Sequence, residues 1–216
     1  MKKLVIIGAS GYVGSALLQE ALRRGYEVKA IVRHPEKITV KDQKLQIVQG
    51  DISSEEAVSQ FVKGADAVIS AYNPGWQNPD IYEETLRNYP FIINGCKKAG
   101  IKRLQIVGGA GSLFIAPGLR LMDSGEVPEK LLPGIKALAE VLFRFLLPEK
   151  SIDWVFLSPS ASLEPGQRTG KYRTGKDDLL TNEKGESKIS VEDYAVAMLD
   201  ELDHPRHHQE RFTVGY

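Results

Sequence analysis

The sequence is poor in cysteine, has no excess of charge of either sign and contains no long apolar run. Its 216 residues include one cysteine, Cys96, so an intramolecular disulfide is impossible. The 28 basic and 28 acidic side chains cancel, so no net field attracts nucleic acid or an anionic membrane, and we expect neither as a partner. No segment approaches the roughly 20 apolar residues that cross a bilayer, and "MKKLVIIGAS" does not read as a signal peptide. We therefore expect a cytoplasmic protein.

Short apolar, β-branched runs alternate with longer stretches of helical period, which is typical of βαβ units and a parallel sheet. No repeat or low-complexity linker divides the chain, so we expect one domain over residues 1–216. The pattern predicts an α/β fold with a Rossmann-type, doubly wound parallel sheet. Strands are expected at residues 3–8, 27–33, 45–51, 66–72, 103–109 and 153–159, and helices near 12–24, 54–63, 80–99 and 129–147.

The character of the sequence changes after residue 158. Residues 158–190 carry many glycines, serines and charges, and a helix at 191–202 and a strand at 210–216 are expected to follow. We expect residues 158–190 and 203–216 to form a small C-terminal subdomain on the substrate side. It would cover the carboxyl edge of the sheet, where open α/β folds bind ligands.

The segment "GASGYVG" spaces three glycines between the first predicted strand and the first predicted helix. This is the context of a dinucleotide-binding turn. Gly8 makes the tight turn, Gly11 lets the backbone approach a pyrophosphate, and Gly14 lets the helix lie against the sheet. The helix then directs its free N–H groups at the phosphates. A glycine-rich turn that binds nothing is the alternative.

The end of the second strand, "IVRHPEKI", bears on the choice of dinucleotide. An acidic residue there binds the ribose 2′-hydroxyl of NAD, whereas arginine suits the 2′-phosphate of NADP. Arg33 therefore favours NADP(H) as the coenzyme, with NAD(H) possible. The alternative is that Arg33 is a solvated residue at a strand end with no role in binding. Asp51, in "GDIS", is expected to contact the adenine side through its carboxylate and the backbone of Ile52.

The segments "VIIGASGYVGSALLQEAL", "AIVRHPEKI", "GDIS", "DAVISAYNPG" and "IVGGAGSL" resemble the atypical short-chain dehydrogenase/reductases. The chain is most similar to their NAD(P)-binding group named for flavin reductase and biliverdin reductase B, within the NAD-dependent epimerase/dehydratase superfamily. The resemblance extends over nearly the whole chain. It is specific for fold and coenzyme and weaker for substrate, since the group includes reductases, epimerases and redox sensors.

The resemblance also implies coenzyme contacts. The pyrophosphate would be held by Gly8, Ala9, Ser10, Gly11, Tyr12 and Val13, the 2′-phosphate by Arg33, and the adenine by Asp51 and Ile52. The ribose would be lined by Ala71, Tyr72 and Asn73, and the nicotinamide by Gly108, Gly109, Ser158, Pro159 and Ser160.

The catalytic residues depart from the superfamily pattern. Active short-chain dehydrogenases use Tyr-x-x-x-Lys on the helix after the fifth strand, where the lysine lowers the pKa of the tyrosine. Here Lys136 occupies the lysine position but Leu132 stands where the tyrosine would be. A literal Tyr-x-x-x-Lys occurs at 172–176 and reads as a surface strand or turn. Ser112 is either the serine that polarises a carbonyl or a turn cap.

Other residues near the expected site have two readings each. Asn73 and Trp76 lie in "YNPGWQNPD", which reads as a loop whose indole either stacks on a planar ligand or has no such role. Residues 114–134 are punctuated by proline and glycine and read as a mobile cover over the nicotinamide end. The pair His207 and His208 lacks the spacing of a zinc site, so no metal site is expected.

Three functions follow as hypotheses. The first is NADPH-dependent reduction of a small planar acceptor such as a flavin or quinone, which needs orientation more than a proton donor. The second is a non-catalytic NADP(H)-sensing protein. The third, an NAD-dependent epimerase or dehydratase, is disfavoured by Leu132.

Overall fold

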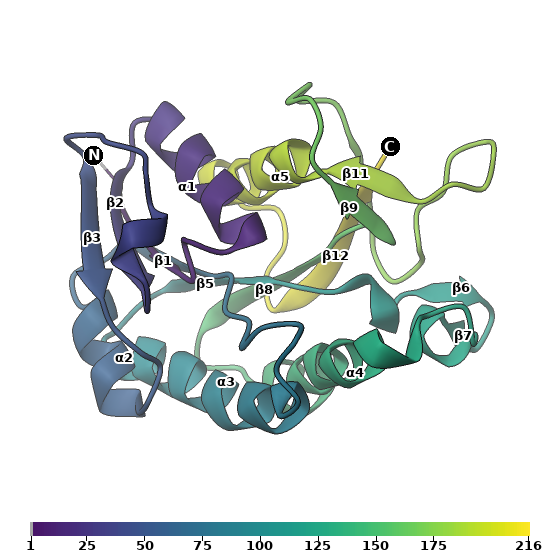
Figure 1. Cartoon of the computed structure of the whole chain (residues 1–216), viewed down its shortest axis with the longest axis horizontal. Coiled ribbons are helices and arrows are strands. Elements are labelled where there is room, and N and C mark those ends of the chain that lie inside the picture. The colour runs from purple at the N-terminus through teal and green to yellow at the C-terminus, as the bar shows by residue number, and fades with distance from the viewer. Residues whose placement is uncertain (1) are drawn as a thin grey trace.

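A computed structural model describes residues 2–216 of the chain (Figure 1). Its helices are α1 (Tyr12–Arg23), α2 (Glu55–Val62), α3 (Ile81–Lys98), α4 (Leu132–Glu140) and α5 (Val191–Asp203). Its strands are β1 (Lys3–Ile7), β2 (Glu27–Val32), β3 (Leu45–Gln49), β4 (Ala67–Ser70), β5 (Arg103–Val107), β6 (Phe114–Ala116), β7 (Leu119–Arg120), β8 (Asp153–Ser158), β9 (Ser162–Glu164), β10 (Arg173–Gly175), β11 (Lys188–Ser190) and β12 (Glu210–Gly215).

The central sheet has eight strands in the order β10-β12-β8-β5-β4-β1-β2-β3. All its pairs are parallel except β10 with β12. The chain runs outward from β1 to β3 and then crosses back to β4 on the other side of β1. This reversal creates the crevice in which doubly wound folds bind ligands. The predicted Rossmann-type α/β fold is confirmed.

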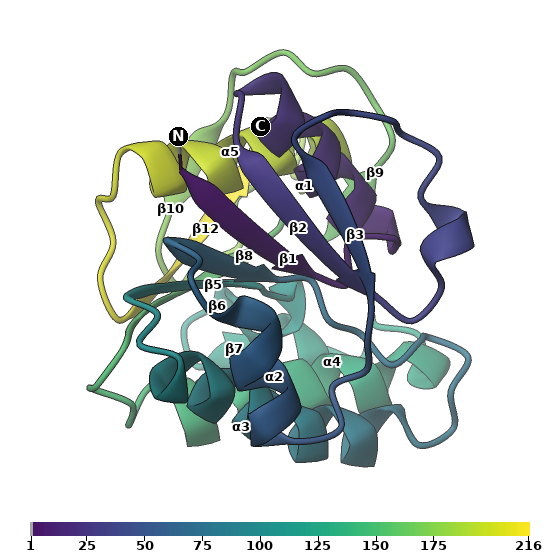
Figure 2. The same cartoon turned by 90° about the vertical axis from the view of Figure 1, so that its left-hand side faces the viewer.

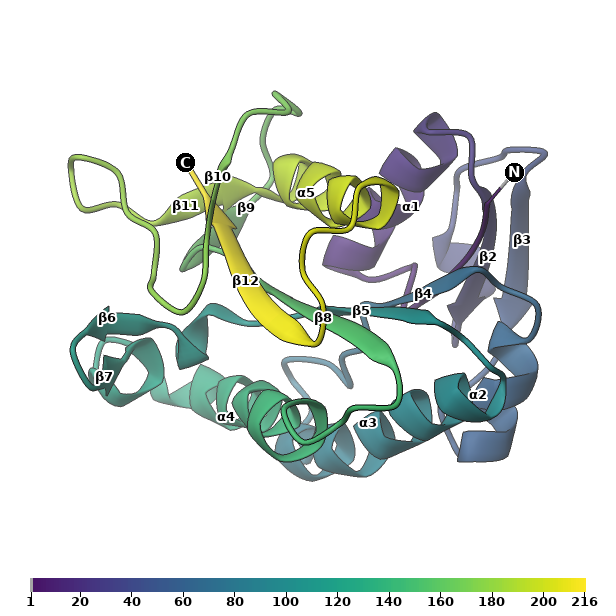
Figure 3. The same ribbon diagram turned by 180° about the vertical axis from the view of Figure 1, so that it is seen from behind.

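Helices cover both faces of the sheet. Helices α1 and α5 pack together on one face, and α2, α3 and α4 on the other (Figures 1 and 3). Because both faces are covered, the inner strands are apolar at successive positions, as in "LVII" of β1, whose four residues are all buried. The strand β3 forms one edge and is partly exposed, as Figure 2 shows from that side. Within residues 2–216, no helix has the length and hydropathy needed to cross a membrane.

The C-terminal residues are distributed between the main sheet and the outer layer differently from our expectation. Residues 210–215 form β12 and lie inside the main sheet, between β8 and β10, so residues 203–216 do not belong to a separate subdomain. Phe212 and Val214 are buried on the α5 face and Thr213 is buried as well, which suits an internal strand. In the segment before α5, β9 pairs with β11 in a small outer layer, while β10 joins the edge of the main sheet.

Candidate functional site

The turn between β1 and α1 is shaped by contacts that exclude side chains. Gly8 has φ of +80° and donates its N–H to Ile31 O at 2.9 Å. A Cβ on Gly8 would lie 2.6 Å from Ala71 O, and a Cβ on Gly14 would lie 2.1 Å from Gly8 O. Glycine is therefore required at both positions by the packing of the main chain itself.

The first turn of α1 has no side-chain cap. Gly11 is the N-cap residue, and no side chain of the described residues accepts a hydrogen bond from the helix end. The N–H of Gly11 donates to Gly8 O at 3.0 Å, while the amides of Tyr12 and Val13 have no acceptor within the helix. Free N–H groups at the positive end of the helix dipole fit the pyrophosphate of a dinucleotide.

Tyr12 lies at the mouth of this turn rather than inside it. Its ring is half exposed, and its hydroxyl donates to Leu163 O of β9 at 3.3 Å. Burial, together with the charges of Glu192 and Glu164, raises the pKa of Tyr12, so the phenol remains a protonated donor at neutral pH. Tyr12 thus ties the turn to the small outer layer.

The predicted adenine and 2′-phosphate contacts are at the carboxyl ends of β2 and β3. Arg33 is exposed, and its Nη2 makes one long contact of 3.5 Å with Pro74 O. No carboxylate of residues 2–216 forms an ion pair with it, so its guanidinium is available to a phosphate. Asp51 accepts the N–H of Ile52 at 2.8 Å, so this amide is already occupied.

The predicted ribose contacts follow β4. Ala71 packs against Gly8 through its carbonyl, and Asn73 accepts the N–H of Gly75 at 2.7 Å and so shapes the loop. Tyr72 is buried, and its hydroxyl accepts a hydrogen bond from Asn88 at 2.5 Å. The phenol of Tyr72 is therefore engaged within the core. Its main chain is engaged as well, because its N–H donates to Ser70 Oγ at 3.4 Å and its carbonyl accepts from the Tyr89 hydroxyl at 3.3 Å.

The predicted nicotinamide contacts lie at the ends of β5 and β8. A Cβ on Gly108 would lie 2.4 Å from the ring of Phe156, so this position also requires glycine. Ser160 donates to Val214 O at 3.0 Å. Ser158 is fully buried, and its Oγ has no hydrogen-bond partner among the described residues. A buried hydroxyl without a partner is uncommon, and this one belongs to the last residue of β8, where the nicotinamide is expected.

The two candidate catalytic residues differ in their surroundings. Ser112 is buried, and its Oγ accepts a hydrogen bond from Arg211 Nη1 at 2.8 Å, while Arg211 also binds Asp177. Lys136 is exposed on α4, whose Ile135 and Leu138 face the loop after β5 instead. The arginine in a largely apolar strand was the only sequence signal for the Arg211–Asp177 pair, which our sequence reasoning missed.

The second Tyr-x-x-x-Lys sequence lies elsewhere. The hydroxyl of Tyr172 donates to Asp200 on α5, and burial together with this carboxylate raises the pKa of the phenol. Lys176 pairs with Glu210 at 3.5 Å. Both residues flank β10 and have partners within the protein.

An apolar wall borders the nicotinamide end. The loop after β4 places the indole of Trp76 against the first turn of α4, where a Cβ on Gly134 would lie 2.8 Å from Cζ3 of Trp76.

Residues 114–134, expected as a cover, are anchored at their start. The N–H of Phe114 donates to Asp177 O, and Phe114 O accepts from Leu179 N, both at 2.8 Å.

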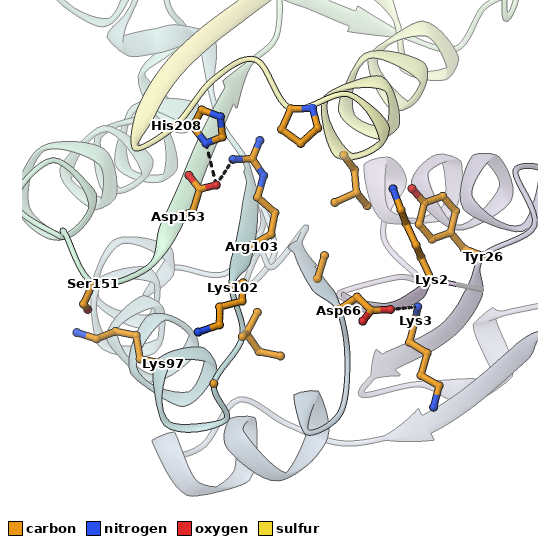
Figure 4. A pocket seen from close by; sticks show the side chains of 15 residues that line it. Lys2, Lys3, Tyr26, Asp66, Lys97, Lys102, Arg103, Ser151, Asp153 and His208 are labelled. Atoms are coloured by element: carbon orange, nitrogen blue, oxygen red, sulfur yellow. Dashed lines mark hydrogen bonds and ion pairs between the residues drawn. The ribbon is translucent and has the colours of Figure 1, made fainter.

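A cavity of about 960 Å³ lies at the opposite, amino edge of the sheet (Figure 4). Several of the charged side chains that line it form ion pairs. Arg103 binds Asp153 at 2.8 Å and the buried Glu201 at 2.6 Å, and Lys97 binds Glu149 at 2.8 Å. Ligands of open α/β sheets bind at the carboxyl ends of the strands, so we do not place the coenzyme in this cavity.

Comparison with known proteins agrees with this geometry. Residues 8–205 match the family model described as NAD(P)H-binding. The chain is 45% identical over 215 residues to the uncharacterised Bacillus subtilis protein YwnB, covering 98% of this chain and 97% of that protein. Two crystal structures are similar over all of this chain. One is a Bacteroides thetaiotaomicron protein proposed to be an epimerase, with 63% identity, TM-score 0.94 and 97% of its length covered. The other is a Streptococcus pneumoniae protein proposed to be an NADH–flavin reductase, with 35% identity, TM-score 0.85 and 99% of its length covered.

Proposed function

Because the chain belongs to the NAD(P)H-binding family, we propose that it is an oxidoreductase that uses NADPH to reduce a small planar acceptor of the flavin or quinone type. The observation that carries the proposal is the lack of the usual proton-donating tyrosine. Leu132 stands at its position, Lys136 is exposed, and Ser112 accepts a hydrogen bond from Arg211. A flavin or quinone accepts a hydride without a donor of this kind, since water supplies the one proton that completes its two-electron reduction.

The residues present fit the coenzyme along its length. The main-chain cradle at Gly8 and Gly14 and the uncapped start of α1 suit the pyrophosphate, and the free guanidinium of Arg33 suits a 2′-phosphate. The unpartnered Ser158 hydroxyl suits the nicotinamide carboxamide. When bound, NADPH supplies a hydride. The protein orients the coenzyme and acceptor and excludes water from one side of them.

Two other functions compete with this proposal. A coenzyme-sensing protein that does not turn over is compatible with the same lack of a donor. An epimerase or dehydratase, as proposed for the Bacteroides protein, is disfavoured because Leu132 stands at the tyrosine position.

The proposal predicts turnover with planar acceptors. NADPH absorbance should fall when the protein is mixed with FMN, menadione or dichlorophenolindophenol, since the acceptor gains the hydride and NADP⁺ is released. The rate is measured at 340 nm against a reaction without protein. Saturable NADPH binding without oxidation across the whole panel would favour the sensor instead.

Ser158→Ala should change stability and binding in opposite directions. Removing a buried hydroxyl that has no partner should raise the free energy of unfolding of the coenzyme-free protein by about 1 kcal/mol. The same change should weaken NADPH binding roughly fivefold or more, because the carboxamide loses a hydrogen bond. Urea denaturation and calorimetric titration measure the two effects.

Ser160→Ala is the comparison for the stability effect of Ser158→Ala. It removes a neighbouring hydroxyl that already donates to Val214 O, so it should lower stability instead. If Ser158→Ala destabilises the protein and leaves NADPH affinity unchanged, the hydroxyl has no role towards the coenzyme.

A further inference from the structure

The two tryptophans of the chain have opposite surroundings. Trp154 is fully buried in the core, and its Nε1 donates to Glu149 O at 3.0 Å. Trp76 is 53% exposed, although it follows β4 at the edge of the sheet where the coenzyme is expected. A half-exposed indole offers a large apolar and aromatic surface on which a planar ligand can stack.

Trp76 is held in place by its packing on α4. A Cβ on Gly134 would lie 2.8 Å from Cζ3 of the indole and 2.7 Å from Cδ1 of Ile81. The absence of a side chain at position 134 lets the ring approach the helix, while about half of the residue stays open to solvent. An aromatic group positioned in this way loses little conformational freedom when a ligand stacks on it.

Half-buried apolar side chains follow Gly134 along α4 and contact the loop after β5. On α4, Ile135 approaches Gly111, and Leu138 Cδ2 lies 3.4 Å from where a Cβ of Gly109 would be. Gly109 is one of the residues expected beside the nicotinamide. The wall therefore leads from an exposed indole to the place where hydride would leave the coenzyme.

We propose that Trp76 is a specificity-determining residue that stacks on the acceptor and selects planar, aromatic molecules. This inference rests on the proposed function and on the nicotinamide position beside Gly109 that the family resemblance implies. The wall offers an apolar surface and an aromatic face, so it suits a conjugated ring better than a sugar or a flexible carbonyl compound. Acceptor binding and coenzyme binding then depend on separate residues.

The test compares Trp76→Ala, Trp76→Phe and the unaltered protein with menadione as acceptor. We expect Trp76→Ala to raise the KM for menadione about tenfold, and Trp76→Phe to keep it within about threefold of the unaltered protein, because a phenyl ring still stacks. The Kd for NADPH should stay within about twofold in both variants. Leu147→Ala removes another exposed apolar side chain, beyond the far end of α4, and should leave the KM unchanged.

Binding is also measured without turnover, from the quenching of tryptophan fluorescence by menadione in the presence of NADP⁺. Saturable quenching that disappears in Trp76→Phe supports the stacking role, since the buried Trp154 is then the remaining fluorophore. Turnover with an unchanged KM in Trp76→Ala overturns this role and leaves the proposed function intact. Saturable quenching by Trp76 without any turnover supports the role and overturns the proposed function. If neither quenching nor turnover is observed, both the stacking role and the proposed function are overturned.

Discussion

Gly14→Ala is expected to lower the free energy of unfolding by about 3 kcal/mol and to abolish measurable coenzyme binding. Its methyl group would lie 2.1 Å from Gly8 O, which is a fixed main-chain atom, so either α1 or the turn must move. The movement displaces the same N–H groups that receive the pyrophosphate. Chemical denaturation measures the first effect, and titration with NADPH measures the second.

Gly11→Ala separates binding from folding and serves as the comparison. Gly11 has φ of −77°, which alanine adopts, and its Cβ would approach Gly8 O only to 3.3 Å. Stability should therefore change by less than about 1 kcal/mol. NADPH affinity should still fall at least about tenfold, because the methyl group occupies the approach to the phosphates. Unchanged affinity in Gly11→Ala would show that the pyrophosphate does not lie against this turn.

Arg33→Gln is expected to weaken NADPH binding at least about tenfold and to leave NADH binding nearly unchanged. Only NADPH carries the 2′-phosphate, and a charge-assisted hydrogen bond to it contributes about 1.5–3 kcal/mol. In the unaltered protein, NADPH should accordingly raise the melting temperature more than NADH does at equal concentration. The protection is followed by thermal unfolding, and the affinities by titration.

Arg23→Gln is the matched control for Arg33→Gln. Arg23 is also exposed, but it lies in the last turn of α1, away from the end that faces the coenzyme. The same loss of charge there should not alter the preference between the two coenzymes. Equal protection by NADPH and NADH in the unaltered protein would remove Arg33 as the source of discrimination.

The strands of the sheet were predictable because each is recognisable from its own local sequence. The runs around Val5, Ile31, Val68 and Ile106 are short, apolar and β-branched, and the residues between them have helical period. The family resemblance that we inferred from "GASGYVG" and its neighbours is confirmed by the match over residues 8–205. Both signals depend on neighbouring residues, which a sequence displays directly.

The features that eluded prediction depend on contacts between distant parts of the chain. The Oγ of Ser112 is held by Arg211, which lies 99 residues later, so its surroundings could not be read from "GGAGSL". The exposure of Lys136 depends on how α4 is rotated, and Gly134 and Ala137 set that rotation by packing inward. The position of β12 beside β8 likewise depends on contacts with distant residues. The sequence of residues 210–216 predicts a strand but does not specify which strand it pairs with.

The strand order also bears on synthesis at the ribosome. β8 pairs with β5 on one side and with β12 on the other, and the edge strand β10 pairs with β12 alone. A nascent chain that has emerged only as far as α5 therefore leaves one side of β8 with unpaired main-chain groups and β10 with nothing to join. Open strand edges of this kind invite pairing with other chains. Chaperone protection should matter most in the interval before residues 210–215 appear.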